Sequence, residues 1–349
     1  MTSVQTLGIE PALIGNPHNV APSADQVIGA RHDIPLYSET CFLTSWNPDN
    51  GVGLFLHAGR CRQDVELWWA QALVYLPDGR IASDRSWGRS PDNDTVQTGN
   101  FVIRMDNPLH GWSSTFDGAA EITTAELMTR HPSGAGVARP MRWDFHTEAA
   151  GPVWDMYAAL GRETMHDFAQ GSHTQQVLHI RGSVTIDGTE YALDGPAAND
   201  HSSGAREMRN FGGHYFLVGA LPGRALHTIS IFGMDGSELV TAGTEFRATG
   251  DNPTLVLTDV PTLDRLDTLP PSFESTLSHD GERTPVRIDV LHQAPISITT
   301  DNDNINGVDT DGPDLLVLSE ARVQLTLPDG TVGHAHLERS TQRSRLNQA

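Results

Sequence analysis

Short runs of β-forming residues, separated by tight-turn signals, recur along most of the chain. "SETCFLTSW" and "VGLFLHAGR" flank "NPDNG", and four further pairs of runs flank "PDG" or "DG". Each run has the length of a strand, is rich in β-branched or aromatic residues and partly alternates between apolar and polar positions. An Asp-Gly or Asn-Gly step between two such runs is typical of a β-hairpin. The pattern therefore predicts a mainly β, antiparallel fold.

Successive hairpins favour closed barrels or sandwiches, because closure removes exposed sheet edges. A chain of 349 residues suits two domains of roughly 150 to 200 residues each. We therefore expect two lipocalin-like antiparallel β-barrel or sandwich domains packed together. The expected segments are an N-terminal extension (1–34), a first domain (35–205), a second domain (206–340) and a polar tail (341–349). Helical periodicity is scarce, and residues 151–171 are the best candidate for a helix.

All seven tryptophans fall within the first 154 residues. One interpretation is a Trp-rich core in the first domain. The alternative is that some of them line a pocket for an apolar ligand, because such pockets favour aromatic walls with few polar groups. On the second interpretation Trp69 and Trp87 are candidate substrate-binding residues.

The formal net charge of −21 argues against nucleic acid as a partner, because phosphate binding needs clustered Lys and Arg. No apolar run approaches the ~20 residues that span a bilayer, and the first residues lack the pattern of a signal peptide. We therefore expect a cytoplasmic protein without a membrane span. Cys41 and Cys61 are the two cysteines, too few for a disulfide scaffold or a four-cysteine zinc site.

Common catalytic and nucleotide motifs are missing from the sequence. It contains no G-x-S-x-G elbow, P-loop, G-x-G-x-x-G or H-E-x-x-H. The stretch "DNDNINGVDTDGPD" resembles a calcium loop through Asn302, Asn304, Asn306 and Gly307, but Pro313 stands where an EF-hand has its bidentate Glu. Asn and Asp also favour turns for local reasons, so we expect a solvated loop there.

A second candidate metal motif is "GHAHLE" near the C-terminus. On a strand, His334, His336 and Glu338 would project from one face, because the side-chain period is two. Two imidazoles and a carboxylate suit a transition metal, whereas an exposed polar strand face is the alternative. We expect the alternative, with no metal and no organic cofactor.

The stretch "NDHSSGAR" gathers proton-handling groups at the end of a predicted strand. Because adjacent residues of a strand face opposite sides, Asp200 and His201 are not expected to pair with each other. We expect His201 to face a cavity, where an imidazole can act as an acid or a base. Asp200 is then expected to bind backbone amides or Arg206. Arg206 would bind a substrate carbonyl or tie the two domains together.

The surroundings of this stretch resemble a known family. "HTQQVLHIRGSVTIDGTEYALDGPAANDHSSGAR", "SETCFLTSW…VGLFLHAGR…LWWAQALVYLPDGR" and "VGHAHLER" are similar to segments of the carotenoid 1,2-hydratase (hydroxyneurosporene synthase) and AttH-like superfamily, in its uncharacterised bacterial branch. The likeness spans about residues 35 to 340, and its most specific part is Asp200–His201–Ser202–x–Gly204–x–Arg206. Where the family pattern has a Trp, this chain has Ser203, and the strand motif downstream offers His227, Thr228 and Ser230 without a carboxylate.

The resemblance implies two lipocalin-like domains and an activity on a hydrophobic molecule. The hydratases add water to an isoprenoid double bond without a metal or organic cofactor, and related fungal proteins catalyse Diels–Alder ring closure. We therefore expect a cofactor-independent lyase or isomerase acting on an isoprenoid or steroid-like small molecule. Its expected catalytic residues are His201 with Asp200, helped by His227 and His146, and its expected substrate-binding residues include Arg206 and Ser203. The alternative is a carrier that binds a lipophilic ligand without turnover.

Overall fold

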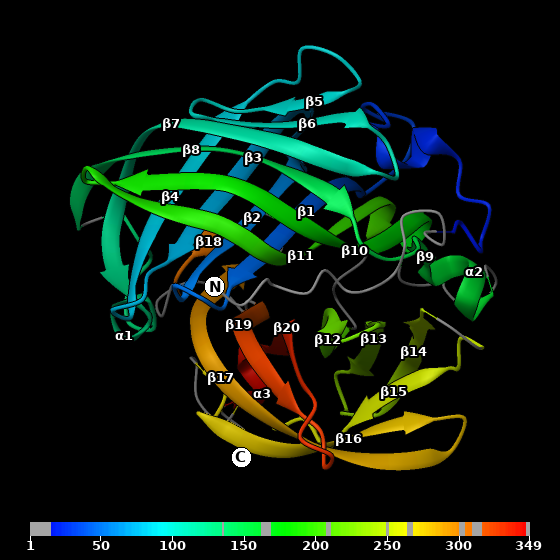
Figure 1. The fold of residues 1–349 in the computed structure, drawn as a ribbon. Helices are drawn as coiled ribbons and strands as arrows, with labels where there is room; N and C mark the ends of the chain where they lie inside the picture. Colours follow the sequence, from blue (N-terminus) through cyan, green and yellow to red (C-terminus); the bar gives the residue numbers. More distant parts are fainter. Residues whose placement is uncertain are drawn as a thin grey trace.

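The computed structural model describes residues 15–134, 136–161, 169–206, 211–248, 251–263, 268–299, 304–308 and 316–346. Two curved antiparallel sheets make up almost all of its regular structure, and each is rolled into a barrel-like shape (Figure 1). The two barrels pack against each other, with the earlier part of the chain forming one and the later part the other (Figure 1). The mainly β, two-barrel prediction is confirmed.

The first barrel comprises eleven strands among the described residues. They are β1 (Tyr37–Asn47), β2 (Val52–Cys61), β3 (Asp64–Tyr75), β4 (Arg80–Gly88), β5 (Thr95–Gln97), β6 (Phe101–Asn107), β7 (Gly111–Thr124), β8 (Val137–Ala149), β9 (Trp154–Asp155), β10 (Ala169–Ile186) and β11 (Thr189–Arg206). The order across the sheet is β4-β3-β2-β1-β11-β10-β8-β7-β6-β5, and β9 pairs with β10. The barrel closes because β4 also pairs with β7, at Arg80–Ser83 and Glu121–Thr124.

The second barrel comprises nine strands among the described residues. They are β12 (Phe211–Leu221), β13 (Arg224–Gly233), β14 (Glu238–Arg247), β15 (Leu255–Thr258), β16 (Ser272–His279), β17 (Glu282–Ile298), β18 (Asn304–Asn306), β19 (Leu316–Thr326) and β20 (Val332–Gln342). The order is β14-β13-β12-β20-β19-β17-β16-β15, and β18 pairs with β17. A single bridge between Thr244 and Thr254 brings the two edges of this sheet together.

Helices are few and short in the described residues. They are the 3-10 turn η2 (Pro22–Asp25), α1 (Ala125–Met128), α2 (Met156–Leu160) and α3 (Arg343–Leu346). The helix expected within residues 151–171 therefore forms over α2, and residues 162–168 lie outside the described part of the chain. Among the described residues, none of the helices has the length and apolar character needed to cross a membrane.

Alternation along the strands divides the apolar side chains among three clusters. In β1, Leu43 packs inside the first barrel, whereas Phe42 packs in the layer between the barrels. In β12, Leu217 packs inside the second barrel, whereas Phe216 joins Phe42 in the layer between them. The strands between the barrels therefore bury both faces, one in a barrel and one in the interface. This explains why polar residues on these strands end up buried rather than solvated.

Most of the tryptophans are buried in the hydrophobic clusters of the fold. Trp68, Trp112 and Trp143 are fully buried inside the first barrel. Trp154 is buried in the layer between the barrels. The interpretation as a Trp-rich core is the one the structure supports.

Part of the calcium-like loop expected from the sequence is buried against the first barrel. Asn302 and Pro313 lie outside the described residues, but Asn304 and Asn306 are 1% and 2% exposed. The Asn304 amide donates to His57 Nδ1 (2.8 Å) and to Gln71 Oε1 (3.0 Å). The Asn306 amide donates to Ser83 Oγ (2.8 Å) and accepts from Gln71. The prediction of a solvated loop was therefore wrong at these positions, because both side chains satisfy polar groups of the first barrel.

Candidate active site

A cavity of about 170 Å³ lies between the two barrels. Its apolar lining comes mainly from the second barrel and from β1, and includes Phe42, Phe216, Ile229, Ile231, Leu316 and Leu318. Its polar lining comes from both barrels and contains several groups that can carry protons. An apolar chamber with a few convergent polar groups is the usual form of a small-molecule site.

The polar wall of the first barrel is built around Asp200 on β11. Asp200 Oδ2 contacts His173 Nε2 on β10 and accepts a hydrogen bond from the Gln175 amide (3.0 Å). His173 and Gln175 are cavity-lining neighbours because they lie two positions apart on one strand. Burial opposes ionisation of Asp200, but the charge and hydrogen bond of His173 outweigh it and lower the pKa of this carboxyl. The Asp200–His173 couple is therefore an ionised carboxylate holding an imidazole at the cavity.

Arg206 lies at the end of β11 on the same wall. Its guanidinium donates to Ser202 Oγ and to Thr40 Oγ1 (3.2 Å), and these two hydroxyls contact each other at 2.8 Å. Ser203 also lines the cavity, with its hydroxyl 3.1 Å from that of Ser172. A guanidinium held by neutral hydroxyls keeps donors available for an oxygen of a bound molecule.

The polar wall of the second barrel contains Glu338 on β20. Its carboxylate forms an ion pair with His214 Nε2 on β12, and His214 Nδ1 lies 2.6 Å from Ser340 Oγ. Both Glu338 and His214 line the cavity. This couple and the Asp200–His173 couple therefore line one cavity from different barrels.

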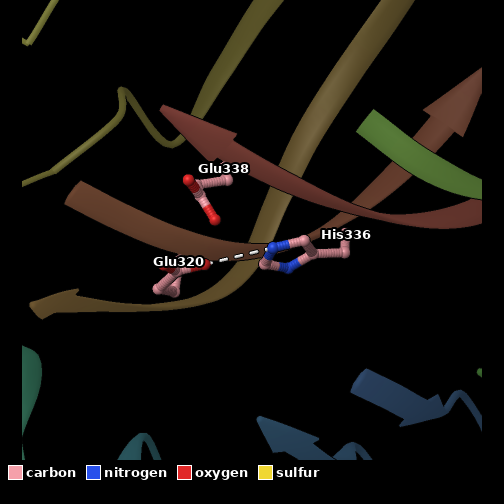
Figure 2. Close-up of side chains that lie close together, drawn as sticks. All are labelled: Glu320, His336 and Glu338. Atoms are coloured by element: carbon pink, nitrogen blue, oxygen red, sulfur yellow. Dashed lines mark ion pairs between the residues drawn. The ribbon is translucent and has the colours of Figure 1, made fainter. Parts of the chain in front are cut away.

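A third carboxyl, Glu320 on β19, lies beside Glu338. Figure 2 shows Glu320, His336 and Glu338 converging on one point. The His336 Nε2 atom is 3.1 Å from Glu320 Oε2, without the alignment of a hydrogen bond. Burial raises the pKa of Glu320 well above its ordinary value, and the carboxylate of Glu338 adds to the effect. Burial and then the charge of Arg322 lower the pKa of His336 well below its ordinary value.

The same three residues have the composition of a metal site. Each offers one ligand atom, and these atoms lie within 4.8 Å of one another. However, the Arg322 guanidinium lies 2.6 Å from His336 Nδ1. Because a guanidinium can only donate, Nδ1 must be the acceptor and the ring proton sits on Nε2, the atom that faces Glu320. A metal-binding imidazole needs the opposite tautomer, so the donor set does not fit a metal through His336.

The structure reverses the expected orientation of Asp200 and His201. Asp200 lines the cavity, whereas His201 is 1% exposed and points into the first barrel. There its Nε2 lies 3.2 Å from Glu39 Oε1, and the other Glu39 oxygen accepts from Arg60 (2.7 Å). As expected, the two neighbours do not pair. Asp200 lines the cavity because the second barrel covers the face of β11 from which its side chain projects.

The other expected site residues are spread over different environments. The ring of His227 is buried and its Nδ1 lies 3.3 Å from the Gln175 amide oxygen, so it sits one contact behind the cavity wall. His146 is exposed on β8, away from the cavity lining. Trp69 is buried against the ring of His57, with centroids 5.0 Å apart. Trp87 is 47% exposed on β4 beneath Arg85. Neither tryptophan lines the cavity.

His334 does not line the cavity that Glu338 lines. It lines a smaller pocket with Arg322 and His336, whereas Glu338 lines the main cavity. The shared strand face expected for the three residues therefore does not bring them to one site.

Comparison with known proteins places the chain in a family. A model described as a domain of unknown function (DUF7064) matches residues 25–343. The chain belongs to the DUF7064 family. No curated protein matches this DUF7064 chain.

Solved structures share the fold of this DUF7064 chain. An AttH-like protein from Nitrosomonas europaea has a TM-score of 0.60 at 15% identity, over 89% of this chain and 94% of that one. Kievitone hydratase from Nectria haematococca has a TM-score of 0.55 at 12% identity, over 93% of each chain. CghA, solved with Sch210972, has a TM-score of 0.52 at 10% identity, over 88% and 89%. These likenesses confirm the AttH-like two-barrel fold that the sequence resemblance implied.

Several cavity residues escaped the sequence reasoning. His173 and Gln175 lie in the polar run that opens "HTQQVLHI", and Glu320 alternates with apolar residues in "EARVQLTL", so both stretches resemble solvated strand segments. The one available signal was that both stretches carry ionisable groups on the same face as neighbouring polar side chains. The sequence does not tell that the second barrel covers that face.

Proposed function

We propose that this protein is a hydratase-like enzyme, a hydro-lyase or isomerase that moves protons on a hydrophobic small molecule without a cofactor. The observation that carries the proposal is the apolar cavity between the barrels, with one carboxyl–imidazole couple on each wall. Carboxyl groups contributed by both barrels can supply and remove a proton at different positions of one bound molecule. The apolar lining selects an isoprenoid or steroid-like skeleton.

The roles on the first wall follow from its contacts. Asp200, ionised and oriented by His173 and Gln175, is placed to accept a proton from water or from a carbon acid. His227 supports this arrangement by donating to the Gln175 oxygen. Arg206 and Ser203 are placed to bind a carbonyl or hydroxyl oxygen of the substrate. Such a polar contact fixes one end of an otherwise apolar molecule.

The names of the structural neighbours agree with this class of chemistry. One of them is a hydratase by name, and another was solved with Sch210972. Because a fold hosts many reactions, the proposal rests on the cavity and takes only its reaction class from these names.

The test is incubation of the purified protein with a panel of isoprenoid and prenylated aromatic alkenes in water enriched in ¹⁸O. Hydration gives a product that carries the heavy oxygen, and isomerisation gives a product of unchanged mass with a new retention time. Heat-denatured protein and the Asp200→Asn variant are the controls. If no compound is converted while several bind, the enzymatic proposal is wrong.

A carrier function is the second candidate. The observation in its favour is the apolar wall of the second barrel, where Phe216, Ile229 and Leu318 offer shape and area without polar contacts. Mass spectrometry of ligands that co-purify with the protein separates the two functions. A bound lipid that stays unchanged on incubation supports the carrier, whereas a converted one supports the enzyme.

A further inference from the structure

Glu320 occupies an unusual position for a carboxyl group. Its side chain is 1% exposed, yet it lines the cavity. Its Oε2 atom has no hydrogen-bond partner among the described residues. A buried oxygen without a partner is costly, so such a group usually has a chemical or ligand-binding role. The carboxyl therefore lines the chamber while one of its oxygens is buried and unsatisfied.

The surroundings of Glu320 are arranged so that its neighbour, Glu338, carries the negative charge. Glu338 has the His214 imidazole as its ion-pair partner, whereas Glu320 lies beside the His336 ring, whose charged form is disfavoured by burial and by Arg322. Two carboxyls this close do not both ionise readily, because the second charge would be buried beside the first. The carboxyl without an ionic partner is then the one that keeps the proton, and burial raises its pKa in the same direction.

The same surroundings can receive the charge once the proton leaves. His336 Nε2 lies 3.1 Å from Glu320 Oε2, and the Arg322 guanidinium on Nδ1 leaves the ring proton on Nε2. Arg322 is itself buried over the ring of Tyr75. An N–H donor at this distance, backed by a cation, can stabilise a developing carboxylate. The site therefore suits a carboxyl that cycles between its neutral and ionised forms.

We propose that Glu320 is the proton donor of the site, acting from the second barrel, whereas Asp200 lies on the first. This assignment rests on the function proposed above. In a hydration, the Glu320 O–H bond breaks and the alkene π electrons form a C–H bond, which leaves a carbocation and a Glu320 carboxylate. Water then forms the C–O bond and gives its proton to the Asp200–His173 couple. Proton exchange with solvent restores both walls, and the net change is the addition of one water.

His336 and Arg322 are positioning residues in this scheme. They act through Glu320: His336 lies beside its carboxyl group, and Arg322 keeps the ring proton of His336 on the nearer nitrogen. Among the described residues, the titratable and charged groups around the Glu320–His336 pair are Arg322 on the strand of Glu320, Glu338 on β20, His214 on β12, Tyr75 on β3, His292 on β17 against Tyr75, and His57 on β2.

The protonation state can be tested without a substrate. Infrared spectra of the whole protein near pH 7.5 should contain the carbonyl stretch of a protonated carboxyl group, and Glu320→Gln should remove it. Asp25, whose pKa burial also raises, contributes a similar band, so the difference spectrum between wild type and variant isolates Glu320. Glu245→Gln is the matched control, because Glu245 is equally buried but pairs with Arg247 and His279. A difference spectrum without the band overturns the proposal.

Activity decides the role of the proton. With any alkene that the wild type hydrates, Glu320→Gln should lower turnover at least about 100-fold while the unfolding midpoint stays near that of wild type. Glu320→Asp should retain part of the activity, with a shifted pH profile, because it keeps the acid. Unchanged turnover in Glu320→Gln overturns the assignment even if the band is present. If no alkene is hydrated, the function proposed above fails, and the infrared result still decides whether Glu320 holds a proton.

Discussion

Asp200 and His201 are consecutive residues of β11, but their side chains lie in different parts of the fold. Asp200 contacts His173 at the cavity between the barrels, whereas His201 contacts Glu39 inside the first barrel. The two residues are consecutive, but successive side chains of a strand project from opposite faces of the sheet. Substitutions at the two positions should therefore have different consequences, one for turnover and the other for stability.

Asp200→Asn should lower turnover at least about 100-fold on an alkene that the wild type converts, because the amide cannot accept the proton. The amide keeps the size of the side chain and its contact with Gln175, so folding should change little. The measurement is the initial rate of ¹⁸O-labelled product, together with the thermal unfolding midpoint.

His201→Gln is the comparison. At equal concentrations of folded protein it should keep turnover within a few-fold of wild type, because His201 lies outside the cavity lining. The opposite pattern, with His201→Gln inactive and Asp200→Asn active, would restore His201 as the acid or base that the sequence resemblance implied.

The fold was predictable because it depends on local signals. The Asp187–Gly188 turn ends β10 and begins β11, and residues of that kind mark the ends of most hairpins in both barrels. The orientation of the site residues was not predictable in the same way. Along β11, Ala197 and Ala198 face opposite sides and are equally small, so hydrophobicity does not show which side meets the second barrel.

The cavity residues of the second barrel could not be predicted from the sequence for a related reason. Glu320 and Arg322 alternate with Ala321 and Val323, a pattern that normally marks one solvated face of a strand. In the structure that face is covered by the first barrel, and both charged residues are buried. Contacts between sheets distant in the sequence decide this, and one sequence does not show them.

Glu39→Gln should destabilise the first barrel strongly. Glu39 is fully buried, accepts from Arg60 and His201, and also accepts from the backbone of Ile28 (2.7 Å). Removing its charge leaves the Arg60 cation buried without compensation, a change that typically costs about 3 to 5 kcal/mol. Urea unfolding at pH 7 measures it. The control is Asp117→Asn, which breaks the exposed pair with Arg142 and should have little effect. Equal effects of the two substitutions would show that the buried pair adds no special stability.

We expect no stoichiometric transition metal in the purified, untagged protein. The reason is the Arg322 guanidinium, which holds the proton of His336 on the nitrogen that would have to bind the metal. Elemental analysis of wild type and His336→Ala should give the same low content of iron, manganese and zinc. About one metal ion per chain, lost in His336→Ala, would contradict this and would also remove Glu320 from its role as proton donor.

The last prediction concerns the stability of the interface in acid. Burial lowers the pKa of His57 to about 4, and the Asn304 amide on Nδ1 requires the neutral ring. In the unfolded chain the imidazole takes up a proton near its ordinary value of 6.5. At a pH between these two pKa values the imidazole is protonated in the unfolded chain and neutral in the folded protein, so acid favours unfolding. The His57 contribution to the free energy of unfolding is therefore complete above about pH 6.5 and falls, by up to about 3 kcal/mol, as the pH drops to about 4.

His57→Gln isolates this contribution, because the amide does not titrate and still offers an oxygen to Asn304. Urea unfolding of both proteins at several pH values should show a shallower fall for the variant between about pH 6.5 and 4, with parallel curves at higher pH. Other buried histidines, among them His227 with a pKa near 3, act equally in both proteins and cancel in the comparison. Hydrogen exchange at β18 should rise in acid in the wild type, because protonation of His57 breaks the contact that ties Asn304 to the first barrel. Identical pH curves for the two proteins would mean that His57 takes up its proton at the same pH in the folded protein as in the unfolded chain. The contact of Asn304 with His57 would then not control the stability of the interface in acid.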